Sequence, residues 1–170
     1  MRYAILGNSG SGKSTLARAL ASFHSLTCLD LDVVAWVPGT VGVPREPSAA
    51  AADVSRFCAG HHAFVLEGCY ENLIAASLDF GPHLVFLDVS AELCEMHCRS
   101  RPYEPHKYES REAQDRKLEF LLTWVRAYQT REGTMSRGAH EELYEAYDGP
   151  KSRFLGEVGL DPFGEIVGIA

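Results

Sequence analysis

The apolar and polar positions along the chain alternate between short apolar runs and amphipathic segments. The apolar runs predict buried strands, which we place at residues 2–6, 26–29, 63–66 and 84–87. Helical spacing of apolar side chains predicts four helices, which we place at residues 12–23, 49–59, 72–78 and 90–100. Ser48 would cap the second helix and Gly60 would end it, while Ser90 would cap the fourth. This alternation is typical of a parallel sheet with helices on both faces.

The last seventy residues are more polar. The stretch 101–111 contains Pro102 and Pro105 and predicts a loop. Further elements are expected after it, namely helices at 110–132 and 137–146 and a last strand at 164–169. The predicted fold is therefore α/β with three layers, α/β/α, around a parallel sheet of about five strands. The 170 residues suit a single domain, 1–170, with a lid at about 101–113.

A glycine-rich motif stands between the first predicted strand and the first predicted helix. Residues 7–14 read Gly-Asn-Ser-Gly-Ser-Gly-Lys-Ser, a full match to the phosphate-binding loop G-x-x-x-x-G-K-[ST]. Its backbone N–H groups and the helix dipole would favour the phosphates of ATP, Lys13 would reach the outer phosphates, and Ser14 would ligate Mg²⁺. The predicted nucleotide-binding residues are Gly7, Asn8, Ser9, Gly10, Ser11, Gly12, Lys13, Ser14 and Thr15. The alternative is a glycine-rich loop without a ligand.

Composition narrows the class of protein. Hydrophobic residues make up 46% and charged residues 23%, which is usual for a soluble globular protein. The net charge of −7 argues against a broad basic face, so nucleic acid is not an expected partner. No apolar stretch approaches a membrane span and the N-terminus enters a predicted strand, so we expect neither a membrane partner nor a signal peptide. The five cysteines, mostly in apolar contexts, fit reduced thiols in a cytoplasmic protein.

Two carboxylates follow the second predicted strand. Asp30 and Asp32 are two residues apart, so in extended chain they share one face. A kinase needs a carboxylate to orient the acceptor hydroxyl or to hold Mg²⁺ through water. Asp32 is the preferred candidate for catalysis, substrate binding and the metal, and Asp30 is the second. The alternative is that one or both cap the loop or the next helix.

The third and fourth predicted strands also end in polar residues. Glu67 could place Mg²⁺ or the attacking group, and Gly68 would let a substrate approach the backbone. The alternative is a turn glycine beside a solvated glutamate. Tyr70 would line the acceptor pocket or serve as a core or surface aromatic. Asp88 ends a run shaped like a Walker B strand, where an aspartate holds either Mg²⁺ or the structure.

Arginines flank the predicted lid, at positions 99, 101, 111 and 116. Arginines on a closing lid can neutralise the charge of the transferred phosphoryl group while water is excluded. Arg101, beside Pro102, is the preferred catalytic arginine and Arg99 a substrate-binding candidate; solvated helix-end arginines are the alternative. Arg45 would bind an anionic acceptor or lie on the surface. Trp36 would stack on a planar substrate or anchor the core.

This set of motifs resembles the small P-loop kinases of the adenylate kinase, shikimate kinase and gluconate kinase type. It is more closely similar to adenylate-kinase-like proteins known as DNA topology modulators. The resemblance covers about the first hundred residues and rests on the phosphate loop, Leu31-Asp32 with Trp36, Glu67-Gly68-Cys69-Tyr70, Leu87-Asp88, and Arg99 with Arg101 at the lid positions. The nucleoside-monophosphate and lid signatures of true adenylate kinases are absent, and the glycine-rich acceptor motif of shikimate kinases is reduced to Gly68.

The sequence thus predicts an ATP- and Mg²⁺-dependent phosphotransferase, a P-loop kinase that acts on a small metabolite or a nucleotide. We expect a monomer or a homodimer. One alternative is a nucleotide-binding regulatory protein, similar to the DNA topology modulators, without small-molecule kinase activity. A second alternative is a catalytically inactive P-loop scaffold, against which the intact Lys13, Ser14 and Asp32 argue.

Overall fold

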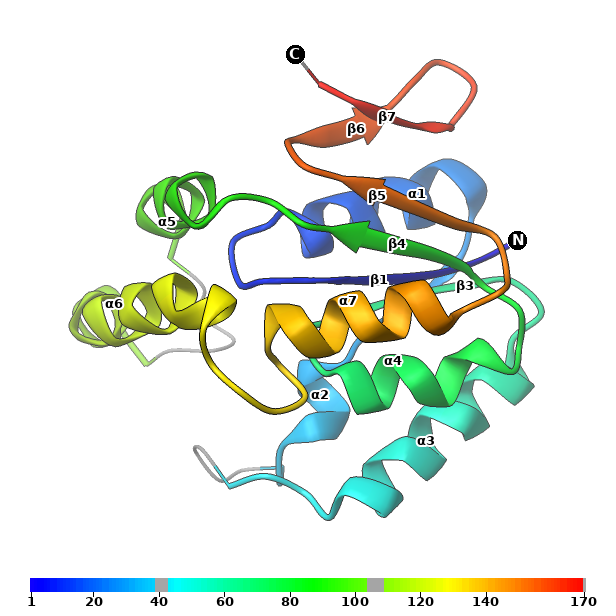
Figure 1. Cartoon of the computed structure of the whole chain (residues 1–170), viewed down its shortest axis with the longest axis horizontal. Coiled ribbons are helices and arrows are strands. Elements are labelled where there is room, and N and C mark those ends of the chain that lie inside the picture. Colours follow the sequence, from blue (N-terminus) through cyan, green and yellow to red (C-terminus); the bar gives the residue numbers. More distant parts are fainter. Residues whose placement is uncertain (39–42, 104–108, 170) are drawn as a thin grey trace.

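Five parallel strands form the centre of the molecule (Figure 1). The structure, a computed structural model, describes residues 1–38, 43–103 and 109–169. The strands of the main sheet are β1 (Arg2–Gly7), β2 (Thr27–Asp30), β3 (Phe64–Gly68), β4 (His83–Leu87) and β5 (Lys151–Phe154). Their order is β2-β3-β1-β4-β5, so the phosphate loop that follows β1 leaves the middle of the sheet.

Helices cover both faces of this sheet. They are α1 (Lys13–His24), α2 (Asp32–Ala35), α3 (Pro47–Gly60), α4 (Glu71–Leu78), α5 (Ala91–Ser100), α6 (Arg111–Arg126), the 3₁₀ turn η1 (Ala127–Gln129) and α7 (Arg137–Ala146). In Figure 1, α1 lies on one side of the sheet, and α3, α4 and α7 lie on the other. None of the described helices is long and apolar enough to cross a membrane.

Alternate side chains of the central strand enter two separate cores, because successive residues of a strand point to opposite faces. Tyr3 and Ile5 pack with α1, α5 and α6, whereas Ala4 and Leu6 pack with α3, α4 and α7. All four are buried, so β1 reads as a continuous apolar run, as expected for a parallel strand covered on both faces. The predicted three-layer α/β/α architecture is confirmed.

The fifth strand corrects the prediction for the end of the chain. The main sheet is completed by β5, whose residues Lys-Ser-Arg-Phe carry no apolar run because this edge strand is only half-buried. The strand expected at 164–169 instead forms a separate antiparallel hairpin, in which β6 (Val158–Leu160) pairs with β7 (Ile166–Gly168). The sequence therefore predicted the number of strands in the sheet but named the wrong segment as the fifth.

Two helix ends also differ from the prediction. Helix α3 is capped by Glu46, whose carboxylate accepts the Ala49 N–H, while Ser48 lies inside the helix and donates to that carboxylate. The long helix predicted to reach residue 132 ends at Arg126, and η1 follows. The guanidinium of Arg131 folds back onto the Trp124 and Met135 carbonyl groups, which stabilises this turn. Ser90 caps α5 as predicted.

The lid predicted at about 101–113 lies partly outside the described residues, since 104–108 are not among them. Its described C-terminal part begins α6 at Arg111, which Ser110 caps by accepting the Ala113 N–H at 3.2 Å.

Candidate active site

The phosphate loop joins β1 to α1 in the conformation that its glycines allow. Gly10 has φ +83° and Gly12 has φ +94°, the left-handed region that side chains disfavour. A Cβ atom on Gly10 would also collide with the Cys94 carbonyl oxygen and lie 2.9 Å from the Cys98 sulfur. The loop thus packs directly on α5, and glycine is required there for both reasons.

Asn8 anchors the loop from within. This residue is fully buried, its side-chain amide donates to the Val125 carbonyl at 3.0 Å, and its side-chain oxygen accepts the Ser9 N–H at 2.9 Å. Lys13, 8% exposed, donates from Nζ to the Asn8 carbonyl at 2.8 Å. The lysine that the sequence assigns to the outer phosphates is therefore folded back along the loop.

Two further observations fit an anion at this loop. No side chain caps the N-terminus of the twelve-residue helix α1, because its N-cap is Gly12. Among the described residues, the Ser11 Oγ is the one buried side-chain oxygen or nitrogen without a hydrogen-bond partner. Buried polar atoms are usually satisfied, so this one, within the loop assigned to phosphate, fits a ligand with oxygens to offer.

Glu67 from β3 meets the phosphate loop directly. The Ser14 hydroxyl donates to Glu67 Oε1 at 2.6 Å, and Glu67 is only 4% exposed. Burial raises the pKa of Glu67, while the Lys13 ammonium and the Ser14 hydrogen bond act in the opposite direction. The alternative of a solvated glutamate at this position is wrong.

The carboxylates after β2 lie beside this pair. Leu31 donates its N–H to the Glu67 carbonyl at 2.9 Å, which joins the ends of β2 and β3. Asp30 accepts the Asp32 N–H at 2.9 Å, and both aspartates act electrostatically to raise the pKa of Glu67. Asp32 Oδ1 accepts the Tyr70 hydroxyl at 2.7 Å. The residues predicted from the ends of strands one to three are thus brought together.

The donor set fits a hard divalent cation such as Mg²⁺, which prefers oxygen ligands. Ser14 offers a hydroxyl, and Glu67 and Asp32 offer carboxylates from neighbouring strands. Within the described ranges, no group of three or more His, Cys, Asp or Glu side chains could hold a metal ion by itself. A Mg²⁺ ion here would therefore draw its remaining ligands from phosphate oxygens and water.

Packing accounts for Gly68. A Cβ atom at this position would lie 2.8 Å from the Cβ atom of Leu31 and 3.2 Å from Cδ2 of Tyr70. The glycine therefore lets β2 and the start of α4 close against β3. Its role in admitting a substrate stays a prediction.

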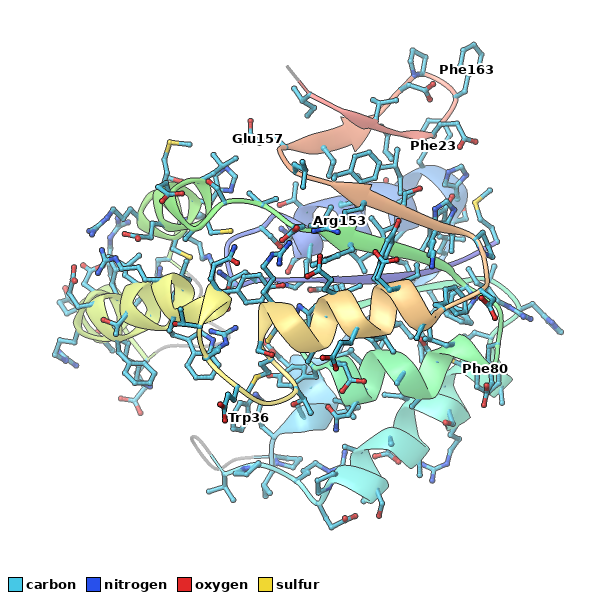
Figure 2. All side chains as sticks on the ribbon, viewed as in Figure 1. Phe23, Trp36, Phe80, Arg153, Glu157 and Phe163 are labelled. Atoms are coloured by element: carbon cyan, nitrogen blue, oxygen red, sulfur yellow. The ribbon has the colours of Figure 1, made fainter. Side chains whose placement is uncertain are left out.

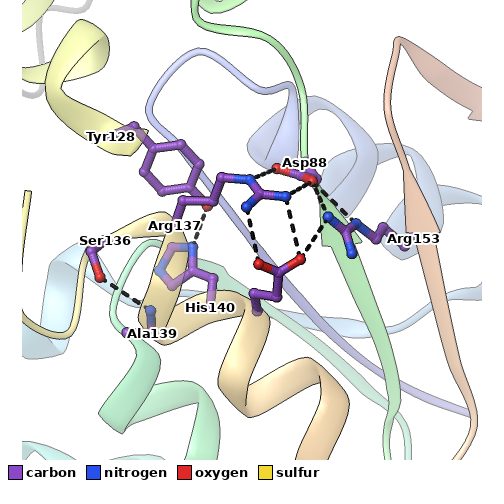
Figure 3. A network of polar contacts seen from close by, with 8 residues as sticks. Asp88, Tyr128, Ser136, Arg137, Ala139, His140 and Arg153 are labelled. Atoms are coloured by element: carbon purple, nitrogen blue, oxygen red, sulfur yellow. Dashed lines mark hydrogen bonds and ion pairs between the residues drawn. The ribbon is translucent and has the colours of Figure 1, made fainter. Parts of the chain in front are cut away.

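Asp88, itself buried, belongs to a partly buried ion-pair network (Figure 3). It accepts hydrogen bonds from Arg137 and Arg153, and both arginines also contact Glu141. Burial by itself would raise the pKa of Asp88, but the two guanidinium groups outweigh burial and hold this pKa below its usual value. The network ties β4 to β5 and α7, which agrees with the structural alternative for Asp88.

The arginines predicted for the acceptor and the lid contact groups on α3, α5 and α6. Arg45 pairs with Asp53 on α3 at 2.7 Å and donates to the Val34 carbonyl at 3.1 Å. Arg99 Nη1, on α5, lies 3.6 Å from Glu119 Oε1. Arg101, which follows α5, donates from Nη2 to the Cys98 sulfur at 3.8 Å. Their roles toward a substrate stay predictions.

Two histidines whose contacts the sequence did not predict hold the site from outside. His97 contacts the Gly10 carbonyl through Nδ1 and Glu157 through Nε2, each at 2.8 Å; Figure 2 labels Glu157. His140, fully buried, donates from Nε2 to the Cys69 carbonyl at 2.9 Å and lies 2.7 Å from the Tyr128 hydroxyl. The partners of His97 lie 60 and 87 positions away in the sequence, and those of His140 lie 12 and 71 positions away. No local sequence pattern could therefore have predicted these contacts.

No protein-family model matches the chain, and no curated protein matches its sequence. Solved structures do resemble it. A shikimate kinase from Bacteroides thetaiotaomicron superposes with a TM-score of 0.52 at 16% identity, covering 96% of this chain and 91% of that chain. A sugar kinase from Janibacter sp. gives 0.50 at 17% identity, covering 90% and 83%. A proposed kinase from Chloroflexus aurantiacus gives 0.51 at 18% identity, also covering 90% and 83%.

At these identities the likeness shows the fold. The chain has the three-layer α/β fold of the P-loop NTPase type, with a five-stranded parallel sheet, that is seen in small kinases. The fold class expected from the sequence is thereby confirmed.

Proposed function

We propose that this protein is an ATP-dependent phosphotransferase, a small P-loop kinase that transfers the γ-phosphoryl group to a hydroxyl or phosphate of a small metabolite or nucleotide. The observation that carries the proposal is the 2.6 Å contact between the phosphate-loop hydroxyl of Ser14 and the buried carboxylate of Glu67, with Asp32 beside them. A phosphate loop facing carboxylates from two neighbouring strands is what phosphoryl transfer to a positioned acceptor needs. The kinases of similar fold support the same reading.

The nucleotide would lie on residues 7–15. Lys13 would exchange its bond to the Asn8 carbonyl for the outer phosphates, and the uncapped start of α1 would receive the inner ones. Ser14, Glu67 and Asp32 would hold Mg²⁺, which supplies charge neutralisation at the phosphates when it is bound. The Ser14 hydroxyl, 2.6 Å from Glu67 Oε1, holds this carboxylate beside the loop.

The acceptor would lie against Asp32, with Glu67, Gly68 and Tyr70 as its further neighbours. The acceptor oxygen forms a bond to the γ-phosphorus, the bond to the bridging oxygen of ADP breaks, and Asp32 receives the hydroxyl proton. Arg101 and Arg99 would act from the lid side, and Arg45 would bind an anionic acceptor once it releases Asp53. We expect a single cytoplasmic domain, as a monomer or homodimer.

No specific observation in the described residues favours the alternative of a DNA-acting regulatory protein similar to the DNA topology modulators. That alternative predicts salt-dependent DNA binding without phosphoryl transfer.

An acceptor screen tests the proposal. Wild-type protein is incubated with MgATP and a panel of nucleoside monophosphates, nucleosides, sugar acids and shikimate-like alcohols, and phosphorylated products are identified by ³¹P NMR. We expect one class of acceptor to be phosphorylated. Asp32→Asn should keep ATP binding while transfer falls a hundredfold or more, on the order expected for a lost catalytic base. Unchanged turnover in that variant would remove the role given to Asp32.

A further inference from the structure

A chain of two hydrogen bonds leads from an indole to the proposed base. Trp36 donates from Nε1 to the Tyr70 hydroxyl oxygen at 2.8 Å, and that hydroxyl donates to Asp32 Oδ1 at 2.7 Å. The direction of these two hydrogen bonds is fixed by chemistry, because an indole N–H can only donate. With its oxygen occupied by Trp36, the phenol points its own hydrogen at Asp32.

The environment keeps this donor in place. Tyr70 is 8% exposed, and its ring lies at the start of α4, where Gly68 leaves room for it. The ring of Trp36 meets it edge-on, with 6.4 Å between centroids.

The contact also joins elements that could otherwise move separately. Asp32 and Trp36 stand at the two ends of the short helix α2, whereas Tyr70 precedes α4. A four-residue helix has little stability of its own, so the Asp32 carboxylate depends on tertiary contacts to point in a fixed direction. Figure 2 shows Trp36 on the α2 side of the molecule.

We infer that Tyr70, itself oriented by Trp36, is a positioning residue that aims the Asp32 carboxylate at the acceptor. This inference rests on the proposed function. The role of Tyr70 would be to orient Asp32, whereas the sequence suggested that Tyr70 lines the acceptor pocket. The role of Trp36 would be to orient Tyr70, whereas the sequence suggested that Trp36 stacks on a planar substrate.

A double-mutant cycle separates positioning from general support of the fold. Tyr70→Phe removes one oxygen and keeps the ring, so kcat with MgATP and the acceptor found in the panel should fall about tenfold, the worth of one hydrogen bond. KM for ATP should stay within about twofold, because only the orientation of the base changes. Combined with Asp32→Asn, Tyr70→Phe should cause little further loss of kcat, since both variants remove the same function.

Tyr147→Phe is the matched control, because the Tyr147 hydroxyl donates to the Pro82 carbonyl. The kcat of this variant should equal that of wild type.

The indole N–H signal of Trp36 provides a readout without turnover. The chain has two tryptophans, so Trp36→Phe assigns the signal in a ¹H–¹⁵N spectrum. Tyr70→Phe should move it upfield, and Tyr147→Phe should leave it in place.

Three results would overturn the inference. The first is a Tyr70→Phe variant with wild-type kcat in a protein that phosphorylates its acceptor. The second is a loss in the double variant equal to the product of the two single losses, and the third is an unmoved indole signal. A wild-type protein that is inert with every acceptor would instead refute the proposed function, and the positioning role with it.

Discussion

At the scale of single residues, the geometry of the phosphate loop explains which residue types it contains. Gly10 and Gly12 take left-handed backbone angles, and Gly10 also fills a place where any side chain would meet α5. Asn8 and Lys13 close the loop from inside through buried hydrogen bonds. The motif could be recognised from sequence because the residues that set the backbone angles and hydrogen bonds of the loop follow one another along the chain.

Replacing Gly10 by alanine should therefore damage both the loop and its ligand site. The left-handed backbone and the collision with the Cys94 carbonyl together predict a loss of about 1–3 kcal/mol in the free energy of unfolding. We also expect ATP to bind at least about tenfold more weakly, because the backbone N–H groups lose their direction. Chemical denaturation and calorimetric titration with ATP measure the two effects.

The matched control is Gly156→Ala, where an added Cβ atom has no neighbour within 4 Å and φ is not left-handed. That variant should behave as wild type. A Gly10→Ala protein with wild-type stability and ATP affinity would show that the loop geometry described above does not govern binding.

At the scale of elements, α7 supports the site through a buried histidine. The Cys69 carbonyl only accepts, so His140 donates from Nε2 and its Nδ1 accepts the Tyr128 hydroxyl. Figure 3 shows this contact beside the Asp88 network. Both bonds suit the neutral ring, and burial lowers the pKa of His140 to about 4. Helix α7 is thereby linked to the segment between β3 and α4 that carries Tyr70.

This arrangement predicts a pH-dependent stability. The unfolded chain takes up a proton at His140 below about pH 6.5, whereas the folded chain does so only near pH 4. The unfolded state therefore binds more protons between these values, and the free energy of unfolding should fall as the pH is lowered, by at most about 3 kcal/mol. In His140→Gln this part of the pH dependence should vanish, as measured by urea denaturation from pH 7 to pH 4.

His62→Gln serves as the control, since His62 is exposed. It should keep the full pH dependence. Equal slopes in wild type and His140→Gln would mean that another group is responsible.

The elements also show where prediction from sequence succeeds. Strands β1, β3 and β4 could be placed because they are buried apolar runs, and the sequence also placed β2, although this edge strand is exposed or half-buried. Helix α7 could be placed because its apolar spacing is regular. Strand β5 could not, since an edge strand whose arginine pairs with Asp88 carries no apolar signal. In the candidate site, Asp32 and Glu67 could be predicted because they stand where strands end. His140, which contacts the Cys69 carbonyl, and Arg137, which pairs with Asp88, could not, because they lie on a helix far along the chain from these partners.

At the scale of the whole molecule, the last third of the chain supports the phosphate loop from several directions. Val125 from α6 receives the Asn8 amide, and Glu157, after β5, reaches the loop through His97. The terminal hairpin packs on α1, where His24 contacts the Gly164 carbonyl at 3.0 Å. Figure 2 shows Phe23 and Phe163 in this region. The described contacts of this third are those of a support for the phosphate loop.

Phosphoryl transfer to an acceptor is the activity that we propose for the phosphate loop. The most direct test is acceptor-dependent ADP formation from MgATP by wild type and Lys13→Ala, with both proteins checked for folding. Wild type should form ADP faster when the acceptor is present, and Lys13→Ala should lose on the order of a hundredfold or more of that rate, because the outer phosphates lose their buried cation. ADP formation that does not depend on acceptor, or a Lys13→Ala protein as active as wild type, would contradict the proposed phosphotransferase activity.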